Sequence, residues 1–269
     1  MRHKPYTTFA FFKAAVAGSG LLVVLLAFLE WGLGLPVFLP GIALLLLAFS
    51  VLGFRILQLI YKFQLSRIHD TNQVEALLWL YSRFTPSVNL PAMREVAGSP
   101  DFLKVLVEYY YSHQPQVIVE AGSGVSSIIL SEVLKKEGST TRHYALDHLE
   151  KYAGLTSEKV LNPHSEVLFA PLKAYHIDGN SWKWYDINVL EKVDKIDMLV
   201  IDGPTEDIQP LARYPALPLL KEKLSDRVVI ILDDTNRRDE QRIIQLWQKE
   251  FGLHAKSMFT EKGTVVMWR

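Results

Sequence analysis

The chain has 269 residues, with 29 basic and 29 acidic side chains, 49% hydrophobic residues and no cysteine. This length suits one large domain or two modest ones, and the composition excludes a disordered or fibrous protein. The lack of cysteine excludes disulfides, cysteine-ligated zinc, iron–sulfur clusters and thiol catalysis. The balanced charge provides no overall basic field, so nucleic acid is not expected as a partner.

Two apolar stretches open the chain, at about residues 11–31 and 36–61. Each has roughly 20 residues, the length that an α-helix needs to cross the hydrocarbon of a bilayer. Glycine and proline between them permit a tight reversal of the chain. We therefore predict a transmembrane helical hairpin over residues 1–61. Re-entrant or interfacial insertion and a buried soluble hairpin are the alternatives.

Basic residues flank the outer ends of both stretches and are missing from the turn between them. From Ala14 to Gly53 the only charged residue is Glu30. By the positive-inside rule, both termini are then cytoplasmic. A cleaved signal peptide fits less well, because a second apolar stretch follows the first and no small-residue cleavage site separates them. We expect a multi-pass membrane protein whose remaining part lies in the cytoplasm.

Polar residues begin at Lys62, and residues 62–98 are predicted to form a juxtamembrane helical linker, with apolar side chains at helical spacing. Ser99 followed by Pro100 and an acid is typical of a helix start with a serine cap. The third region, residues 99–269, is predicted to be a soluble domain.

From residue 117 onward, short apolar runs alternate with helix-like segments, which predicts a parallel sheet covered on both faces. The expected strands are 117–121, 143–146, 166–170, 198–201 and 228–232, and the expected helices are 125–137, 149–161, 209–224 and 236–250. Residues 253–259 and 264–268 predict a closing antiparallel hairpin. The fold class is therefore α/β, with a Rossmann-like sheet of seven strands.

The first strand runs into Glu-Ala-Gly-Ser-Gly-Val-Ser-Ser at residues 120–127. Gly122 and Gly124 permit a tight turn and a close approach of backbone to ligand. The following serines, Ser126 and Ser127, open a helix whose free N–H groups favour a carboxylate or phosphate. Ser127 stands where a dinucleotide fingerprint needs a third glycine. The carboxylate of Glu120 suits a cationic ligand better than a phosphate.

Asp147 ends the second predicted strand, where an acid can accept hydrogen bonds from both hydroxyls of a ribose. Its alternative role is to cap the helix that follows. The alternative role for Glu120 is that of a buried acid bonded to backbone.

Three further acids end neighbouring strands: Asp202 after the fourth, and Asp233 and Asp234 after the fifth. Carboxylates this close repel one another unless one is protonated or a cation lies between them. Oxygen ligands suit magnesium, calcium or manganese rather than zinc. Alternatively, Asp234 caps the next helix and Asp202 only shapes a turn.

Two other groups of polar and aromatic residues have open roles. Trp182, Trp184 and Tyr185 are expected in a polar loop after the third strand, where they line an acceptor pocket or form a packing cluster. Arg213 is expected at a helix start, either exposed to solvent or holding an anionic acceptor.

Taken together, the glycine loop, the strand-end acids and the closing hairpin resemble the class I S-adenosylmethionine-dependent methyltransferases. More narrowly, residues 99–269 resemble the metal-assisted small-molecule O-methyltransferases and their bacterial relatives. The resemblance implies S-adenosylmethionine as cofactor, with adenine near residues 170–172. The cofactor-binding residues that it implies are Glu120, Gly122, Ser123, Gly124, Ser126, Asp147 and His148.

Asp202 and Asp233 match the strand-end acids of that family, and we expect them, supported by Asp234, to act on the acceptor. They either take its proton or hold Mg²⁺ or another divalent cation as metal ligands. In the family an asparagine stands where this chain has Asp234.

We therefore expect a membrane-anchored methyltransferase that acts on the oxygen of a small or lipid-linked acceptor. A nicotinamide-dependent oxidoreductase and a non-catalytic cofactor-binding membrane scaffold are the rival interpretations, and aminopropyl transfer is a third.

Overall fold

The computed structural model describes residues 18, 20–21, 23–32, 34, 38–94 and 97–269. The chain forms two compact units, Met1–Ile68 and His69–Arg269. Helix α2 (Phe38–Arg83) runs without a break from the first unit into the second. The predicted domain boundary at residue 61 therefore lies inside a continuous helix.

Among the described residues, one helix is long and apolar enough to cross a membrane, Leu44–Arg83 within α2. A shorter apolar helix, Val23–Gly32, precedes it. A Cβ atom on Gly41 would overlap the side chain of Leu26, so the two helices approach closely at this glycine. Most of the first half of the first predicted span lies outside the described residues.

The second unit is built on one seven-stranded sheet in the order β3-β2-β1-β6-β7-β9-β8. Its strands are β1 (Val117–Ala121), β2 (Arg142–Asp147), β3 (Ser165–Phe169), β6 (Ile196–Ile201), β7 (Leu224–Leu232), β8 (His254–Met258) and β9 (Thr264–Trp268). The first five strands in this order run parallel, and β9 is antiparallel to both β7 and β8. The predicted mostly parallel sheet with a closing hairpin is confirmed.

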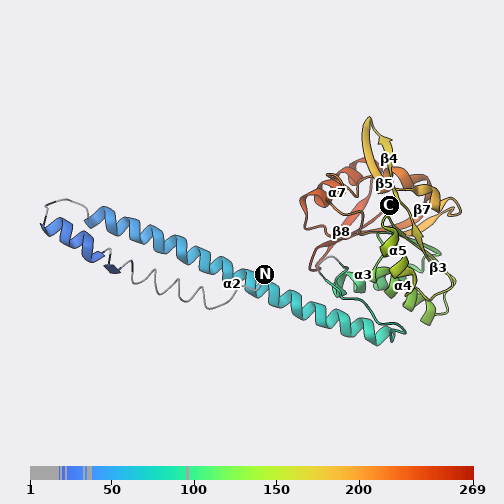
Figure 1. The fold of residues 1–269 in the computed structure, drawn as a ribbon, viewed down its shortest axis with the longest axis horizontal. Coiled ribbons are helices and arrows are strands. Elements are labelled where there is room, and N and C mark those ends of the chain that lie inside the picture. The colour runs from blue at the N-terminus through green and yellow to red at the C-terminus, as the bar shows by residue number, and fades with distance from the viewer. Residues whose placement is uncertain (1–17, 19, 22, 33, 35–37, 95–96) are drawn as a thin grey trace. The chain divides into compact units, whose positions relative to one another are not determined.

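Helices cover both faces of the sheet, as Figure 1 shows. Val119 and Ala121 of β1 join the core formed with α6 (Ala216–Leu220) and α7 (Arg238–Phe251). Between them, Ile118 joins the core on the opposite face. That second core contains α3 (Pro100–His113), α4 (Val125–Lys136) and the end of α2. The alternation of side chains along a strand explains why both faces of β1 are apolar.

The start of α3 differs in detail from the prediction. The Ser99 hydroxyl donates to Asp101 Oδ1 at 2.6 Å instead of accepting from the helix backbone. The same carboxylate oxygen accepts the N–H of Phe102 at 2.9 Å. Asp101, in the first turn, therefore satisfies a free helix N–H in place of the predicted serine cap.

The expected helix over 209–224 is mostly irregular. Only α6 and a 3₁₀ turn, Lys221–Lys223, form there, and β7 begins immediately afterwards. Proline cannot donate a backbone hydrogen bond inside a helix, and this segment contains Pro210, Pro215 and Pro218. The helix-like spacing of apolar residues was therefore outweighed by the prolines.

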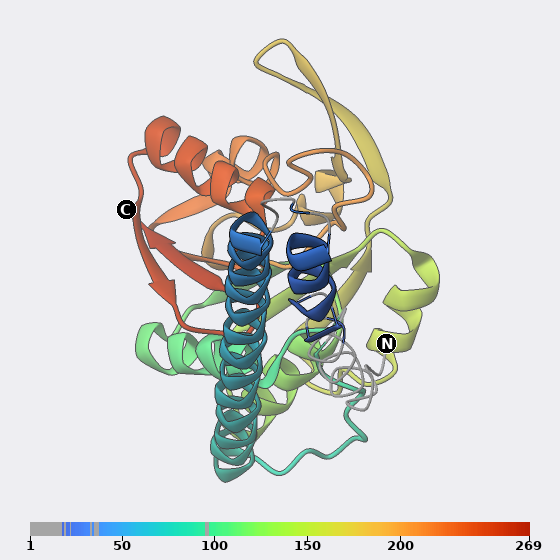
Figure 2. The same ribbon diagram turned by 90° about the vertical axis from the view of Figure 1, so that its left-hand side faces the viewer.

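The expected polar loop after the third strand is instead a β-hairpin. Strands β4 (Leu172–Ile177) and β5 (Asn180–Tyr185) pair antiparallel, and Figure 2 shows the hairpin projecting from the domain. Asp178 and Gly179 both have positive φ, at 48° and 79°, as the tight turn between two strands requires. Trp184 and Tyr185 are buried at the base of the hairpin, so their assignment to a polar loop was wrong.

Candidate methyl-donor and acceptor site

The glycine loop lies between the ends of β2 and β6. The Gly122 N–H donates to Leu146 O at 3.0 Å, and the Asp202 N–H donates to Ala121 O at 2.9 Å. Gly122 has a φ of 105°, and a Cβ atom there would lie 3.1 Å from the backbone carbonyl of Asp202. Only glycine satisfies both conditions. A Cβ on Gly124 would meet nothing within 4 Å, so the loop is open on that side.

Asp147 is tied to this loop by its side chain. Its Oδ2 accepts from the Ser123 hydroxyl at 2.7 Å, and its Oδ1 accepts from the N–H of Leu149 at 2.9 Å. The second bond lies just before α5 (Glu150–Ser157) and orients the carboxylate. Each carboxylate oxygen can still accept a second hydrogen bond, so the acid is held in place but remains able to bind a ligand.

Glu120 lies in the interior of the domain. Its Oε2 is 2.9 Å from His143 Nε2, and both side chains are 1% exposed. The other oxygen, Oε1, is buried and has no partner among the described residues. The acid is therefore held by a side chain of β2 rather than by backbone, and one oxygen has unused capacity to accept a hydrogen bond.

Tyr185 reaches the same edge of the sheet from β5. A Cβ on Gly203, just after β6, would overlap the Tyr185 hydroxyl, and the His148 ring packs edge-on against Tyr185 with centroids 5.9 Å apart. Burial raises the pKa of Tyr185 well above its usual value, so its hydroxyl stays protonated. The sequence analysis missed this placement, although Asp178-Gly179 is a strong hairpin signal.

The three strand-end acids do come together. Asp202, Asp233 and Asp234 each offer a carboxylate oxygen within 4.8 Å of the others. Asp233 is fully buried, Asp234 is nearly so, and Asp202 is partly exposed. Asp233 accepts from the Thr264 hydroxyl at 3.1 Å, while its Oδ2 is buried and has no partner among the described residues.

Arg213 lies among these acids instead of on the surface, so the expectation of an exposed arginine was wrong. It is 3% exposed. One nitrogen donates to Asp234 Oδ2 at 2.6 Å and to Asp202 Oδ1 at 3.2 Å. Another donates to the backbone carbonyl of Asp233 at 2.9 Å. The guanidinium thus connects the ends of β6 and β7.

Burial determines the direction of the pKa shifts in this cluster. It raises the pKa of Asp202 to about 6, and Arg213 opposes the rise. Burial and the two neighbouring acids raise the pKa of Asp233. Burial disfavours the charged form of Arg213, but Asp202 and Asp234 outweigh it and raise the arginine pKa. Asp202 is therefore a carboxylate that can exchange a proton near neutral pH.

Carboxylate oxygens are the ligand type that a hard divalent cation prefers, but Arg213 already occupies an oxygen of Asp202 and of Asp234, and only Asp233 Oδ2 has no partner among the described residues. Such an ion would be held by Asp202, Asp233 and Asp234, and it would lower the pKa of an acceptor hydroxyl. The charge of the cluster does not demand one, because Arg213 already pairs with two of the three acids.

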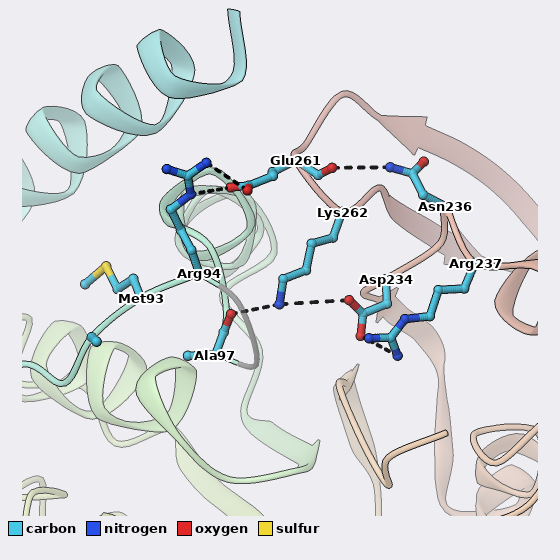
Figure 3. A pocket seen from close by; sticks show the side chains of 9 residues that line it. Met93, Arg94, Ala97, Asp234, Asn236, Arg237, Glu261 and Lys262 are labelled. Carbon is cyan, nitrogen blue, oxygen red and sulfur yellow. Dashed lines mark hydrogen bonds and ion pairs between the residues drawn. The ribbon is translucent and has the colours of Figure 1, made fainter. Parts of the chain in front are cut away.

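An open pocket of about 960 Å³ adjoins the cluster at Asp234. It is lined by Ala92, Met93, Arg94 and Ala97, by Asn236 and Arg237 just before α7, and by Glu261 and Lys262 in the turn that joins β8 to β9. Figure 3 shows this lining. Arg94 forms two hydrogen bonds to Glu261, at 2.7 and 2.9 Å. Lys262 donates to Ala97 O at 2.8 Å and lies 3.9 Å from Asp234. Of the lining residues, only Asp234 had been singled out from the sequence.

Part of the domain matches a known protein family. Residues 119–235 match a family described as "Methyltransferase domain". The chain contains a methyltransferase domain. The match covers the end of β1 from Val119, the glycine loop, Asp147 and the whole carboxylate cluster. No curated protein sequence matches the chain.

Solved structures agree on the fold. The SAH-bound methyltransferase PaMTH1 of Podospora anserina has a TM-score of 0.50 and 12% identity, covering 74% of this chain and 88% of its own. An O-methyltransferase from Bacillus cereus in complex with SAH has a TM-score of 0.48 and 19% identity, covering 73% of this chain and 90% of its own. The likeness to PaMTH1 shows that the domain shares the fold of that methyltransferase.

Proposed function

We propose that this methyltransferase uses S-adenosylmethionine to methylate an oxygen of a small or membrane-associated acceptor, and that α2 anchors it to a membrane. The observation that carries the proposal is the meeting of the glycine loop, Asp147 and the carboxylate cluster at one edge of the sheet. The family match over the same residues favours methyl transfer over nicotinamide chemistry and aminopropyl transfer.

The residues of the loop fit the methyl donor. Asp147 is oriented to accept the ribose hydroxyls, and Gly124 leaves open space beside the loop. The N-terminus of α4, with Ser126 in its first turn, offers N–H groups to a carboxylate. The free oxygen of Glu120 favours a positively charged group. Ser123 and His148 complete the proposed donor site, the former through its bond to Asp147.

The cofactor supplies a methyl group on a positively charged sulfur. The protein must place an acceptor oxygen in line with that methyl group and remove the proton of the hydroxyl. Asp202 is the proposed proton acceptor, because it is the most exposed of the three acids and Arg213 holds its Oδ1. Asp233 and Asp234 support it from β7. The Tyr185 hydroxyl, which stays protonated, is placed to donate a hydrogen bond in the same site.

The acceptor is proposed to bind in the open pocket beside Asp234. One wall combines the apolar side chains of Ala92, Met93 and Ala97 with Arg94. The opposite wall carries Glu261 and further polar groups. A mixed lining of this kind suits an amphipathic acceptor with a hydroxyl-bearing polar part.

Donor binding is tested by calorimetry of the detergent-solubilised full chain with S-adenosylhomocysteine. Asp147→Asn loses charge-assisted hydrogen bonds of about 1.5–3 kcal/mol, so we expect roughly 10- to 100-fold weaker binding. Glu158→Gln, which changes an exposed acid at the end of α5, is the matched control and keeps wild-type affinity. Equal affinity of wild type and Asp147→Asn would refute the assignment.

Membrane anchoring rests on the apolar helix within α2 and on the close packing of Val23–Gly32 at Gly41. We propose two spans, with both termini and the methyltransferase domain in the cytoplasm. The chain should then stay in the membrane pellet after washing with alkaline carbonate, and sealed right-side-out vesicles should protect the domain from added protease. Release into the carbonate supernatant would contradict anchoring, and digestion in sealed vesicles would contradict the orientation.

A further inference from the structure

We propose that the guanidinium of Arg213 supplies the positive charge required by the rim carboxylates, so that the wild-type cluster binds no divalent metal ion. This inference rests on the proposed function and makes Arg213 a positioning residue for Asp202. Of the two roles that the sequence left open for the acids, proton acceptor and metal ligand, we thus favour the proton acceptor.

The hydrogen bonds of the Arg213 guanidinium support this role. Arg213 uses its whole guanidinium: one terminal nitrogen on Asp202 and Asp234, the other on the Asp233 carbonyl, and Nε 3.7 Å from Glu240. The group therefore joins the ends of β6 and β7 to the first turn of α7. A planar fork with five donors can satisfy such a set of acceptors, whereas a hydrated metal ion would need the same carboxylates as ligands.

The burial of Arg213 also supports this role. The side chain of Arg213 is 4% exposed, against 38% for Arg237 and 16% for Lys262, the other cations beside Asp234. A buried guanidinium must be fully paired, and its carboxylate partners cannot move away without leaving it unpaired. Arg213 is therefore a fixed part of the cluster and not a side chain that moves aside for an ion.

The positive charge of Arg213 opposes a metal ion at the same carboxylates. An ion ligated by Asp202 and Asp234 would lie within a few ångströms of the guanidinium that bonds to both, and like charges at that separation in a buried site repel strongly. The acid at position 234, where the resemblance expects asparagine, balances the extra cation. Asp234 and Arg213 together thus form an ion pair in place of a metal centre.

The inference predicts how Asp202 is oriented. Arg213 holds Oδ1, and no described residue forms a hydrogen bond with Oδ2. The free oxygen can then accept a proton from an acceptor hydroxyl without a metal between them. Removing the guanidinium charge leaves three acids in contact with only the more exposed Arg237 and Lys262 beside Asp234, a condition that favours binding of a divalent cation.

Electron paramagnetic resonance of Mn²⁺ with the full chain in detergent tests the inference. Wild type and Arg213→Lys, which keeps the charge, should leave Mn²⁺ free in solution, whereas Arg213→Gln should bind it at least about tenfold more tightly. Asp202→Asn added to Arg213→Gln should abolish the gained binding. Site-specific Mn²⁺ binding by wild type that Asp202→Asn removes would overturn the inference, and so would an Arg213→Gln protein that binds S-adenosylhomocysteine but no Mn²⁺.

Titration with S-adenosylhomocysteine on the same samples separates this inference from the proposed function. A wild-type protein that binds the cofactor product and Mn²⁺ contradicts only the role of Arg213. A wild-type protein that binds neither contradicts the proposed function and leaves the charge argument intact. If Arg213→Gln does not fold, the wild-type and Arg213→Lys measurements still decide the question.

Discussion

Asp202→Asn should lower the rate of methyl transfer by about 10²–10⁴-fold, the usual contribution of a positioned proton acceptor. Asparagine keeps the shape of the side chain and can still accept the hydrogen bond from Arg213, but it cannot take a proton. The affinity for S-adenosylhomocysteine should change little, because Asp202 is not proposed to bind the donor. Transfer of labelled methyl groups from S-adenosylmethionine to the organic-soluble fraction of a membrane extract measures the rate.

The matched control is Asp194→Asn, which changes an exposed acid before the opposite end of β6. It should transfer methyl groups at the wild-type rate. An Asp202→Asn protein as active as this control would rule out Asp202 as the proton acceptor.

The wild-type rate should also depend on pH in a defined direction. Asp202 must be ionised to accept a proton, and its pKa is raised to about 6. The rate should therefore rise as pH increases through this value and level off above it. A rate that falls over the same interval would contradict the assignment.

Gly122→Ala should abolish donor binding and also destabilise the domain. At a φ of 105° a side chain costs about 1–3 kcal/mol, and the new Cβ would press on the backbone of Asp202 at 3.1 Å. Because this backbone joins the donor loop to the carboxylate cluster, both would shift. We expect affinity for S-adenosylhomocysteine at least about 100-fold weaker by calorimetry, and a lower midpoint of thermal unfolding.

Gly138→Ala is the control for backbone strain alone. Gly138 also has a positive φ, 58°, but a Cβ there would meet nothing within 4 Å. This variant should lose stability and keep its affinity for the cofactor product. If both variants lose stability equally and both bind normally, the close approach at Gly122 has no role in donor binding.

The sheet was predictable from sequence because its strands are short, apolar and β-branched, and because parallel strands are buried on both faces. β1 carries this signal in Val117–Val119, and β6 carries it in Met198–Ile201. The closing hairpin was predictable because the turn signal Glu261-Lys262-Gly263 is followed by an apolar, β-branched run at residues 264–268. Strand-end acids could then be placed at one edge by topology alone.

The residues around those acids could not be placed in the same way. Arg213 lies in an irregular segment between prolines, and no local pattern indicates that such an arginine will be buried beneath two strand ends. Its environment arises from contacts between segments far apart in the chain. Arg94 and Glu261, which pair across the pocket, are separated by 167 positions and belong to no motif.

The hairpin β4–β5 is a different case, because its signal was present. Asp178-Gly179 is a turn signal, and in the run after it Trp182 and Trp184 alternate with Ser181 and Lys183, a pattern typical of a strand. The polar residues of the exposed strands outweighed this signal in the sequence analysis. The hairpin places Tyr185 at its base, where the Tyr185 hydroxyl lies against Gly203 in the candidate site.

A crystal structure of the full chain with S-adenosylhomocysteine tests the account most directly. The account predicts the ribose hydroxyls within hydrogen-bond distance of Asp147, the amino-acid part beside Gly122 and Gly124, and the sulfur facing Asp202. A ligand bound elsewhere on the sheet, or a ribose that makes no contact with Asp147, would contradict it.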